Sequence, residues 1–242
     1  MMRRTVLVSL LILLLVVPVL GAEEPPKSPW SGSLGLSFLS TTGNTDTRSF
    51  GGEFGLKRVP DPWGLEFNVK FLGSSKNGVK DAEDTWVTLR GDRNLSEHWA
   101  VYARGSGERN TFAGFDLRTI LEAGATYKAL TGPVHGLSFD GGLSWTSEEP
   151  VSLPSFSYTG AAVGLAYEWK ISPTSVFSEK ARYYADFSDG SNWRIASETA
   201  LKAAISTRLA VKAEYLYRFT NRPPPGYLKT DTATTLSLVA SF

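Results

Sequence analysis

The chain has 242 residues, of which 25 are Lys or Arg, 24 are Asp or Glu and none is Cys. A chain without cysteine has no disulfide, no lipid-modified cysteine, no thiolate nucleophile and no cysteine metal site. The formal net charge of +1 gives no electrostatic case for nucleic-acid binding, and two histidines leave little material for catalysis or metal binding.

The first residues have the composition of an export signal. Arg3 and Arg4 precede an almost unbroken aliphatic run, Val6–Leu20, and Gly21-Ala22 offers a small-residue cleavage site. The run is shorter than the roughly 20 apolar residues that a membrane helix needs, which disfavours the alternative of an uncleaved anchor. The expected divisions are a cleaved signal peptide over residues 1–22, a periplasmic linker over 23–29 and one domain over 30–242.

After the linker, polar and apolar residues alternate along nearly the whole chain. From Trp30 to Phe38 the even positions are apolar or glycine, and the odd positions are small or polar. A period of two indicates β-strands, and an apolar face that no helix or second sheet covers is expected to contact lipid. The sequence therefore predicts an all-β fold, a transmembrane antiparallel up-and-down β-barrel. A soluble β-sandwich is the alternative.

About twelve alternating runs can be marked, most of them close to the 9–11 residues that a tilted membrane strand requires. The predicted strands are Trp30–Thr41, Arg48–Val59, Trp63–Gly73, Thr85–Asn94, Trp99–Arg109, Leu117–Leu130, Leu137–Thr146, Tyr158–Trp169, Ser175–Phe187, Trp193–Ile205, Leu209–Thr220 and Thr230–Phe242. The last run, with Phe242 in its apolar phase, resembles the signal that outer-membrane assembly machinery reads.

The connections between these runs alternate between tight and longer polar segments. After a short first hairpin through Gly43–Asp46, the tight set is expected on the periplasmic side and the longer set outside. The predicted tight turns are 60–62, 95–98, 132–136, 172–174 and 206–208, and the predicted longer loops are 74–84, 110–116, 147–157, 188–192 and 221–229. In the last loop, Pro223–Gly226 is interpreted either as a stiff cover over the mouth or as a spacer.

Aromatic residues gather toward the two ends of the predicted strands. Such bands match the interfacial girdles of a membrane barrel, whereas the core of a soluble fold would scatter them along the strands. The predicted girdle comprises Trp30, Trp63, Trp99, Trp169 and Phe242 at the tight-turn ends, with Trp145 and Trp193 toward the loop ends.

The charged residues occupy the polar phase and are predicted to line the interior, because a charge on the lipid face is costly. In each of four predicted hairpins, a single choice of register places two pairs of oppositely charged residues directly across from each other. Such pairs help to fix the register of the strands. The double matches are Lys57–Glu66 with Glu53–Lys70, Glu108–Arg118 with Arg104–Glu122, Arg182–Glu198 with Asp186–Arg194, and Lys202–Glu214 with Glu198–Arg218. Single matches are Asp92–Arg104, Lys128–Asp140 and Glu168–Lys180.

These pairs predict a filled or narrow lumen. Arg90 is the clearest interior cation without an assigned partner. A structural role is favoured for it, because a diagonal neighbour could pair with it, and contact with a solute is the alternative. The predicted lumen network comprises Glu53, Lys57, Glu66, Lys70, Arg90, Asp92, Arg104, Glu108, Arg118, Glu122, Arg182, Asp186, Arg194, Glu198, Lys202, Glu214 and Arg218.

Several motifs resemble a family of uncharacterised outer-membrane barrels, the domain of unknown function 481 family, often labelled salt-induced outer-membrane protein. They are Trp30-Ser31-Gly32, Gly43–Thr47, Tyr102-Ala103-Arg104 and Arg109–Asp116, followed by Arg118 and Gly124. The resemblance covers nearly all of the chain after the leader. It implies the same fold and location but carries no activity, cofactor or catalytic residue.

The main hypothesis is a structural or narrow-channel protein of the bacterial outer membrane, with no enzymatic activity and no cofactor or metal. The alternatives are an uptake channel that uses Arg90 with Lys70 or Arg104, and a lipid hydrolase. The hydrolase is disfavoured because His98 and His135 fall in predicted periplasmic turns. Expected partners are outer-membrane lipid, lipopolysaccharide, the assembly machinery and, for a channel, a small solute.

The acidic pairs Glu83-Asp84 and Glu148-Glu149 fall in predicted outer loops. Carboxylates there could hold calcium or magnesium that bridges lipopolysaccharide, because these cations prefer oxygen ligands. The spacing matches no dedicated cation-binding loop, so a solvated loop surface is the favoured interpretation.

Overall fold

The computed structural model describes residues 28–41, 47–59, 61–111 and 113–242. The expected signal peptide, most of the expected linker and the turn Gly43–Asp46 lie outside the described residues. Within the described ranges there is no helix long and apolar enough to cross a membrane.

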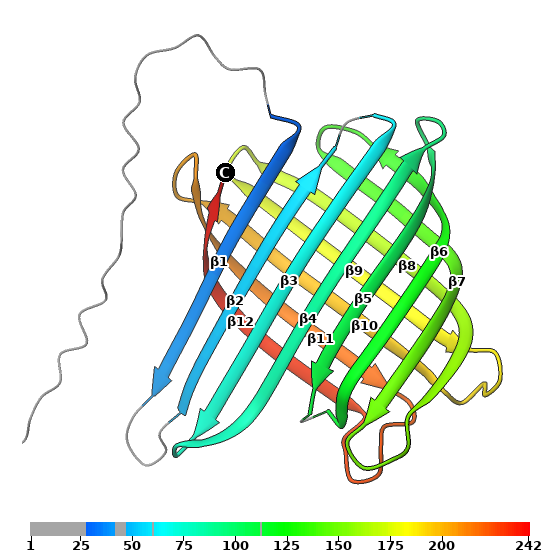
Figure 1. The fold of residues 1–242 in the computed structure, drawn as a ribbon. Coiled ribbons are helices and arrows are strands. Elements are labelled where there is room, and N and C mark those ends of the chain that lie inside the picture. The colour runs from blue at the N-terminus through cyan, green and yellow to red at the C-terminus, as the bar shows by residue number, and fades with distance from the viewer. Residues whose placement is uncertain (1–27, 42–46, 60, 112) are drawn as a thin grey trace, which may run out of the picture.

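In the described part of the chain, twelve strands form one closed antiparallel barrel in which each strand pairs with its neighbours in sequence and β1 pairs with β12 (Figure 1). This confirms the predicted fold. The strands are β1 (Trp30–Thr41), β2 (Thr47–Arg58), β3 (Trp63–Lys76), β4 (Val79–Asn94), β5 (Trp99–Asn110), β6 (Phe115–Thr131), β7 (His135–Pro150), β8 (Phe156–Ser172), β9 (Ser175–Asp186), β10 (Trp193–Ala204), β11 (Leu209–Thr220) and β12 (Thr230–Ser241).

The connections between the strands define two ends of the barrel. The short-turn end, at the top of Figure 1, carries the β2–β3, β4–β5, β6–β7, β8–β9 and β10–β11 connections. The opposite end, here called the long-loop end, carries the remaining connections, of which 187–192 and 221–229 are the longest that the structure describes.

Two predicted long loops are wrong, because the strands continue into them. The β3–β4 hairpin ends at Asn77-Gly78, whose φ angles of 50° and 79° suit a two-residue turn of the type that Asn-Gly favours. Likewise β7 continues to Pro150, which leaves 151–155 as the connection to β8. The asymmetry between the two ends is therefore smaller than the sequence indicates.

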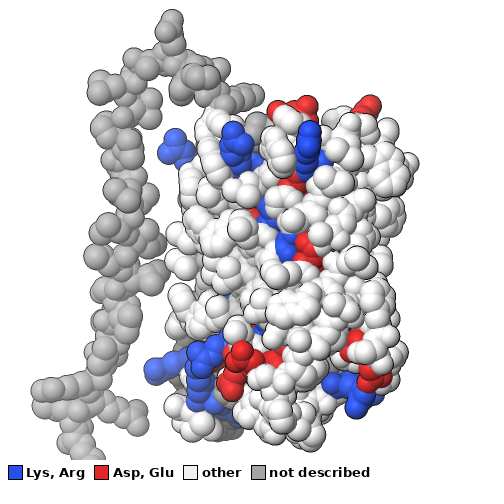
Figure 2. Space-filling model, turned by 45° about the vertical axis from the view of Figure 1, so that its right-hand side comes forward, with Lys and Arg blue, Asp and Glu red and all other residues white. Residues whose placement is uncertain are grey.

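The outer surface is apolar at mid-height, as the alternation predicts. Leu89, Leu121 and Leu143 on β4, β6 and β7 are each at least half exposed to the surroundings of the barrel. In Figure 2 uncharged residues cover most of the face shown; charged residues gather toward its two ends, and a smaller charged group shows between them. A soluble sandwich would bury such residues between two sheets, so this surface suits lipid.

The aromatic residues of the predicted girdle lie near the ends of their strands. Trp30, Trp63 and Trp99 each begin a strand at the short-turn end, and Trp193 begins β10 at the long-loop end. Trp169 lies near the end of β8 and Phe242 just after β12, both at the short-turn end. Trp145 lies in the part of β7 toward the long-loop end. Trp193 stacks on Phe219, with ring centroids 5.0 Å apart.

Glycines let β6 and β7 approach closely on the interior side. A Cβ at Gly142 would lie 2.4 Å from the Ala123 carbonyl oxygen, and one at Gly124 would lie 2.2 Å from the Gly141 oxygen. Both contacts are with backbone, which cannot move aside as a flexible side chain can. Glycine is therefore required where this part of the wall curves.

Candidate functional site: the ion-paired lumen

Ion pairs between strands on opposite walls cross the interior of the barrel. In the order of the strands around the ring, β3 and β9 are six steps apart, as are β5 and β11. Lys180 Nζ on β9 lies 3.9 Å from Glu66 Oε1 on β3, and Arg218 Nη1 on β11 lies 3.6 Å from Glu108 Oε1 on β5. The charged side chains thus meet in the lumen.

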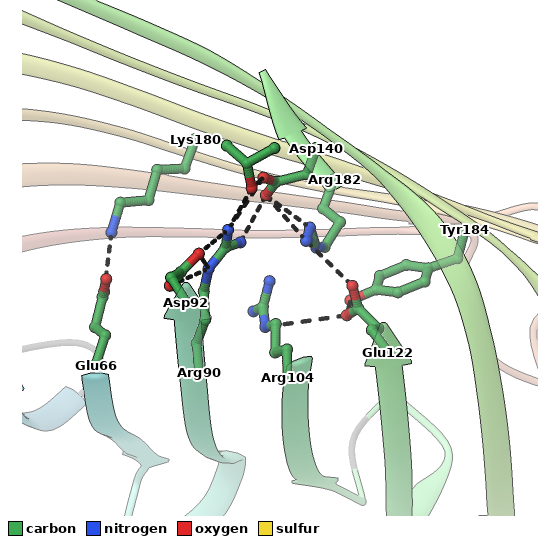
Figure 3. Close-up of polar contacts among 10 residues, drawn as sticks. Glu66, Arg90, Asp92, Arg104, Glu122, Asp140, Lys180, Arg182 and Tyr184 are labelled. Atoms are coloured by element: carbon green, nitrogen blue, oxygen red, sulfur yellow. Dashed lines mark hydrogen bonds and ion pairs between the residues drawn. The ribbon is translucent and has the colours of Figure 1, made fainter. Parts of the chain in front are cut away.

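The central cluster consists of three arginines and three carboxylates: Arg90, Arg104, Arg182, Asp92, Glu122 and Asp140 (Figure 3). Arg90 donates from Nη1 to Asp140 Oδ2 at 2.7 Å and from Nη2 to Asp92 Oδ1 at 2.7 Å. Its Nη2 also donates to Thr126 Oγ1 at 2.8 Å. Arg90 is therefore fully engaged, as the favoured structural role predicts, although the sequence did not identify these partners.

Glu122 contacts Tyr184, Arg182 and Arg104 on the other side of the central cluster (Figure 3). Its carboxylate accepts a hydrogen bond from the Tyr184 hydroxyl at 2.8 Å and lies 3.1 Å from Arg182 Nη2. Arg104 is held more loosely, with its Nε 4.0 Å from Glu122 Oε1. Because Glu122 is fully buried on its side-chain atoms, these contacts replace the water that a carboxylate otherwise requires.

A second group, the lysine cluster, joins β2, β3, β10 and β11. Lys70 Nζ lies 2.5 Å from Glu198 Oε2 and 2.9 Å from Glu214 Oε1. Lys212 bridges Glu214, at 2.5 Å, and Glu53. Since β3 and β10 are not neighbours in the barrel, this cluster also spans the lumen.

A third group, the mouth cluster, lies toward the long-loop end. Its members are Asp84, Glu108, Arg118, Glu148, Arg194 and Arg218. Arg118 Nη1 lies 3.1 Å from Glu108 and its Nε lies 3.2 Å from Glu148, which Arg194 Nη1 also contacts at 3.0 Å. Aromatic faces cover these cations: the guanidinium of Arg118 lies 3.6 Å from the ring centroid of Phe115.

The last long loop crosses the mouth above this cluster. A Cβ at Gly114, in the β5–β6 turn, would lie 2.9 Å from both Pro224 and Tyr227, so the loop packs on the opposite wall. The φ of Gly114, +93°, also favours glycine. These contacts support the cover interpretation of Pro223–Gly226.

Two loops at the long-loop end are joined to each other beside the mouth. Arg222 forms an ion pair with Asp189, and Asn221 Nδ2 donates to the Ser191 carbonyl oxygen at 2.9 Å. The Ser191 hydroxyl donates to the Asp189 carboxylate at 2.6 Å. Hydrogen bonds from the Ser191 side chain and backbone, assisted by Arg222, lower the pKa of Asp189 below its ordinary value of 3.8. We call this contact the loop clasp.

Only two of the registers predicted from opposed charges are confirmed. Glu53 faces Lys70 and Lys57 faces Glu66 in one hairpin, while Glu108 faces Arg118 and Arg104 faces Glu122 in another. The other five predicted registers are wrong by two residues, and the residues that stand opposite are Glu198↔Lys180, Ala200↔Glu214, Asp92↔Tyr102, Thr126↔Asp140 and Ala166↔Lys180. Long side chains reach diagonal and cross-lumen partners, so direct opposition is not required.

Four predicted network residues stand apart from the three clusters. Glu66 pairs with Lys180, at 3.9 Å, outside them. Lys57 is exposed near the short-turn end, and Lys202 is exposed with Lys212 directly opposite it. Asp186 forms no ion pair with Arg194, contrary to prediction. It instead accepts hydrogen bonds from the Ser188 hydroxyl at 2.6 Å and from Asn192 Nδ2 at 3.0 Å.

Other lumen residues were missing from the predicted network. Asp84 and Glu148 were assigned to solvated loops or cation sites, but each lies in a strand and contacts an arginine of the mouth cluster. The remaining additions are Lys212, Trp86, Tyr102, Tyr158 and Tyr184. Asp140 and Lys180 were predicted only as halves of single matched pairs, with other partners than those observed. Their polar-phase positions were a usable signal, because they alternate in step with the predicted lumen residues.

The two histidines lie at the short-turn end, away from the charged clusters. His98 Nδ1 is 2.8 Å from the Lys128 carbonyl oxygen, and His135 Nδ1 is 3.0 Å from the Tyr167 hydroxyl. His135 also stacks on Trp169. Within the described part of the chain, no group of three or more His, Asp and Glu side chains has a geometry that could hold a metal ion.

Comparisons with known proteins place these features in context. Residues 34–242 match the model of a family described as "Protein of unknown function, DUF481". A relative from Escherichia coli K12, the uncharacterised protein YdiY, is 24% identical over 229 residues, covering 92% of this chain and 87% of that protein.

Among solved structures, the COG4313 outer membrane channel from Pseudomonas putida F1 aligns with a TM-score of 0.53 at 13% identity, over 91% of this chain and 100% of that chain. The NanC porin aligns with a TM-score of 0.48 at 12% identity, over 87% and 97% of the two chains. These neighbours are a channel and a porin. At 13% identity the likeness to the COG4313 channel concerns the barrel fold alone.

Proposed function

The chain belongs to the DUF481 family, and we propose that it is a bacterial outer-membrane barrel whose lumen forms a narrow channel closed by ion pairs. The observation that carries the proposal is the set of contacts that cross the lumen, such as Lys70 with Glu198 and Arg218 with Glu108. An open pore would leave its charges to water. Here the three clusters occupy the cross-section instead.

The proposed orientation places the short-turn end in the periplasm and the long-loop end outside the cell. Its support is the usual arrangement of outer-membrane barrels, with short periplasmic turns and longer outer loops. Lipid would then contact the apolar outer face, and lipopolysaccharide would surround the end that carries the loop clasp. The C-terminal strand would be the segment that the assembly machinery reads. The proposed role is non-enzymatic.

Purified protein in planar lipid bilayers tests the closed lumen. We expect small conductance steps or none, because cross-lumen pairs narrow the path at several heights. Large, stable steps from the unmodified protein would contradict the proposal. Fractionation combined with heat-modifiable mobility on gels tests the membrane location, since a folded barrel migrates differently before and after heating.

Specific uptake of a small solute is the second candidate, and three donors on the lumen face of β5 favour it. The buried hydroxyls of Tyr102 and Ser106 have no hydrogen-bond partner among the described residues, and Arg104 lies between them in sequence with a single partner at 4.0 Å. Buried polar groups usually have partners, so such a row suits a solute that brings its own acceptors.

Arg104, more than the fully paired Arg90 and Lys70, is therefore the proposed solute contact. An Arg104→Gln variant should change the flux of anionic relative to neutral solutes in proteoliposome swelling. The matched control is Arg58→Gln at the strand end, outside the three clusters. Equal fluxes for Arg104→Gln and the unmodified protein would reject this candidate while leaving the closed lumen untouched.

A further inference from the structure

The barrel wall is only half closed at the seam between its first and last strands. The ladder between β1 and β12 comprises four opposed pairs: Ser33↔Ser241, Leu34↔Ala240, Gly35↔Val239 and Leu36↔Leu238. Gly32 and Phe242 add a reciprocal pair of backbone hydrogen bonds at 2.8 and 3.0 Å. Every other neighbouring pair of strands has at least ten opposed residue pairs.

The unpaired part of the seam faces the long-loop end. Beyond Leu36, neither Ser37 nor Phe38 has a ladder partner on β12 among the described residues, although both pair with β2. In Figure 1 the two strands lie together near the C-terminus and separate toward the long-loop end. Ser37 is seven positions (37 − 30) from the girdle residue Trp30, so the separation begins within the span of a tilted membrane strand of about 9–11 residues.

An opening at this height is unfavourable if it faces bare hydrocarbon. Each backbone group left without a partner in lipid costs several kcal/mol, which is why membrane barrels normally close completely. On β12 the residues that would continue the ladder, Leu236 and Ser237, pair only with β11. The free edges therefore require an occupant that can offer polar atoms as well as apolar surface.

The interior directly behind the seam has both kinds of surface. A hollow there is lined by Ser37 on β1, by Thr235 and Ser237 on β12, and by charged groups that include Glu53 and Lys70. Leu72 and Leu216 line the same hollow. Outside the seam, Leu36, Phe38 and Leu236 are each more than half exposed. A molecule in the seam would thus meet polar groups at one end and apolar groups at the other.

We propose that the β1–β12 seam is a lateral opening through which a single-chain amphiphile passes between the lumen and the surrounding lipid. Its polar head would contact the seam hydroxyls and the lysine cluster, and its alkyl tail would lie against Leu36, Phe38 and Leu236. Because three carboxylates, Glu53, Asp84 and Glu214, accompany Lys70 and Arg218 around the hollow, a zwitterionic or uncharged polar head suits it best. This inference concerns the wall, and it goes beyond the proposed axial channel.

Disulfide trapping tests the opening, and the native chain provides a background free of cysteine. Ser33 and Ser241 form a directly opposed pair next to the hydrogen-bonded pair of Gly32 and Phe242, so their Cα atoms lie roughly 4.5 Å apart, within disulfide range. Ser37 and Ser237 would form the same kind of pair, on the same face, if the ladder continued by four residues.

We expect the Ser33→Cys/Ser241→Cys variant to cross-link readily in lipid vesicles on oxidation. The Ser37→Cys/Ser237→Cys variant should cross-link at least tenfold more slowly. Equal rates for the two variants would overturn the proposal, because they would show a ladder that continues through the seam. A heat-modifiable gel shift establishes that each variant is folded before the rates are compared.

Access from the bilayer tests the route itself. A cysteine at Leu216, behind the seam, should react with N-dodecylmaleimide partitioned into the vesicles. A cysteine at Ser144, on the lumen face of β7, should react at least tenfold more slowly, and one at the lipid-facing Leu143 gives the reference rate. Dodecylphosphocholine below its micellar concentration should slow the reaction at Leu216→Cys without slowing that at Leu143→Cys.

Reaction at Leu216→Cys as slow as at Ser144→Cys would refute lateral access, and no competition by dodecylphosphocholine would refute the proposed class of ligand. None of these measurements reads axial conductance. A failure of the closed-channel proposal in planar bilayers is therefore distinguishable from a failure of the lateral opening.

Discussion

Neutralising Glu122 is the sharpest test of the idea that paired charges close the lumen. In the central cluster, Arg90, Arg104 and Arg182 balance Asp92, Glu122 and Asp140. A Glu122→Gln substitution keeps the volume and an oxygen that can accept the Tyr184 hydroxyl. It removes the charge that faces Arg182 at 3.1 Å and Arg104 at 4.0 Å, which leaves the cluster with one uncompensated positive charge.

The magnitude follows from burial and geometry. Breaking a buried ion pair by removing one partner costs roughly 3–5 kcal/mol. Glutamine retains the Tyr184 hydrogen bond, Asp140 still contacts Arg182, and the Arg104 side chain is 19% exposed, so part of the loss is compensated. We therefore expect a loss of about 1.5–3 kcal/mol, the range for hydrogen bonds to charged groups.

Two assays follow from this change. The temperature at which the folded band disappears on gels should fall, and ion flux in planar bilayers should increase and shift toward anion selectivity in a salt gradient. Glu149→Gln is the matched control, because Glu149 is exposed and belongs to none of the three clusters. Unchanged stability and unchanged selectivity in Glu122→Gln would refute the reasoning that this carboxylate holds the lumen closed.

Three further predictions address the wall, the cluster and the mouth. Gly142→Ala should destabilise the folded barrel by roughly 1–3 kcal/mol, because the new Cβ would meet the Ala123 oxygen at 2.4 Å. Gly141→Ala should not destabilise the barrel, because nothing lies within 4 Å of the Cβ that it would add. Equal gel-shift temperatures for the two variants would contradict this account. Tyr184→Phe should lower the stability of the folded barrel by about 1 kcal/mol, since Glu122 loses a hydrogen bond at 2.8 Å, and its gel-shift temperature should fall accordingly. The loop clasp should persist from neutral pH down through the ordinary aspartate range, because a lowered pKa keeps Asp189 ionised in the folded loop, and it should open only at lower pH. The separation of spin labels on the two loops should then increase in acid for the protein with native Asp189 and already at pH 7 with Asp189→Asn, whereas identical pH profiles would count against the clasp.

The fold could be predicted from the sequence because lipid imposes one constraint on every strand. Leu89, Leu121 and Leu143 had to face lipid, and the alternation that places them on the outer face marked the strands almost to their ends. The error at the β3–β4 hairpin has a local cause. The turn residues Asn77-Gly78 lie inside a polar segment, where the alternation is weaker than the preference of Asn-Gly for a tight turn.

The lumen partners were less predictable than the lumen residues. Arg90 pairs with Asp140 three strands away, and Lys70 pairs with Glu198 on a strand that is distant in both sequence and ring order. Such partners depend on the diameter of the barrel and on how the strands are staggered, which no single hairpin encodes. Opposed charges therefore indicated the correct face but the wrong register in five hairpins.

The cross-lumen pairs and the half-paired seam bear on each other. The lysine cluster links β3 to β10 and β11, so it connects the two walls on either side of β1, β2 and β12. These pairs can hold the walls in place while the ladder between β1 and β12 stops at Leu36, because the barrel no longer relies on that ladder alone. Weakening the cluster with Lys70→Gln should then raise the cross-linking rate of the Ser37→Cys/Ser237→Cys variant, as the freed strands move together. An unchanged rate would show that the seam is held open by β1 and β12 themselves.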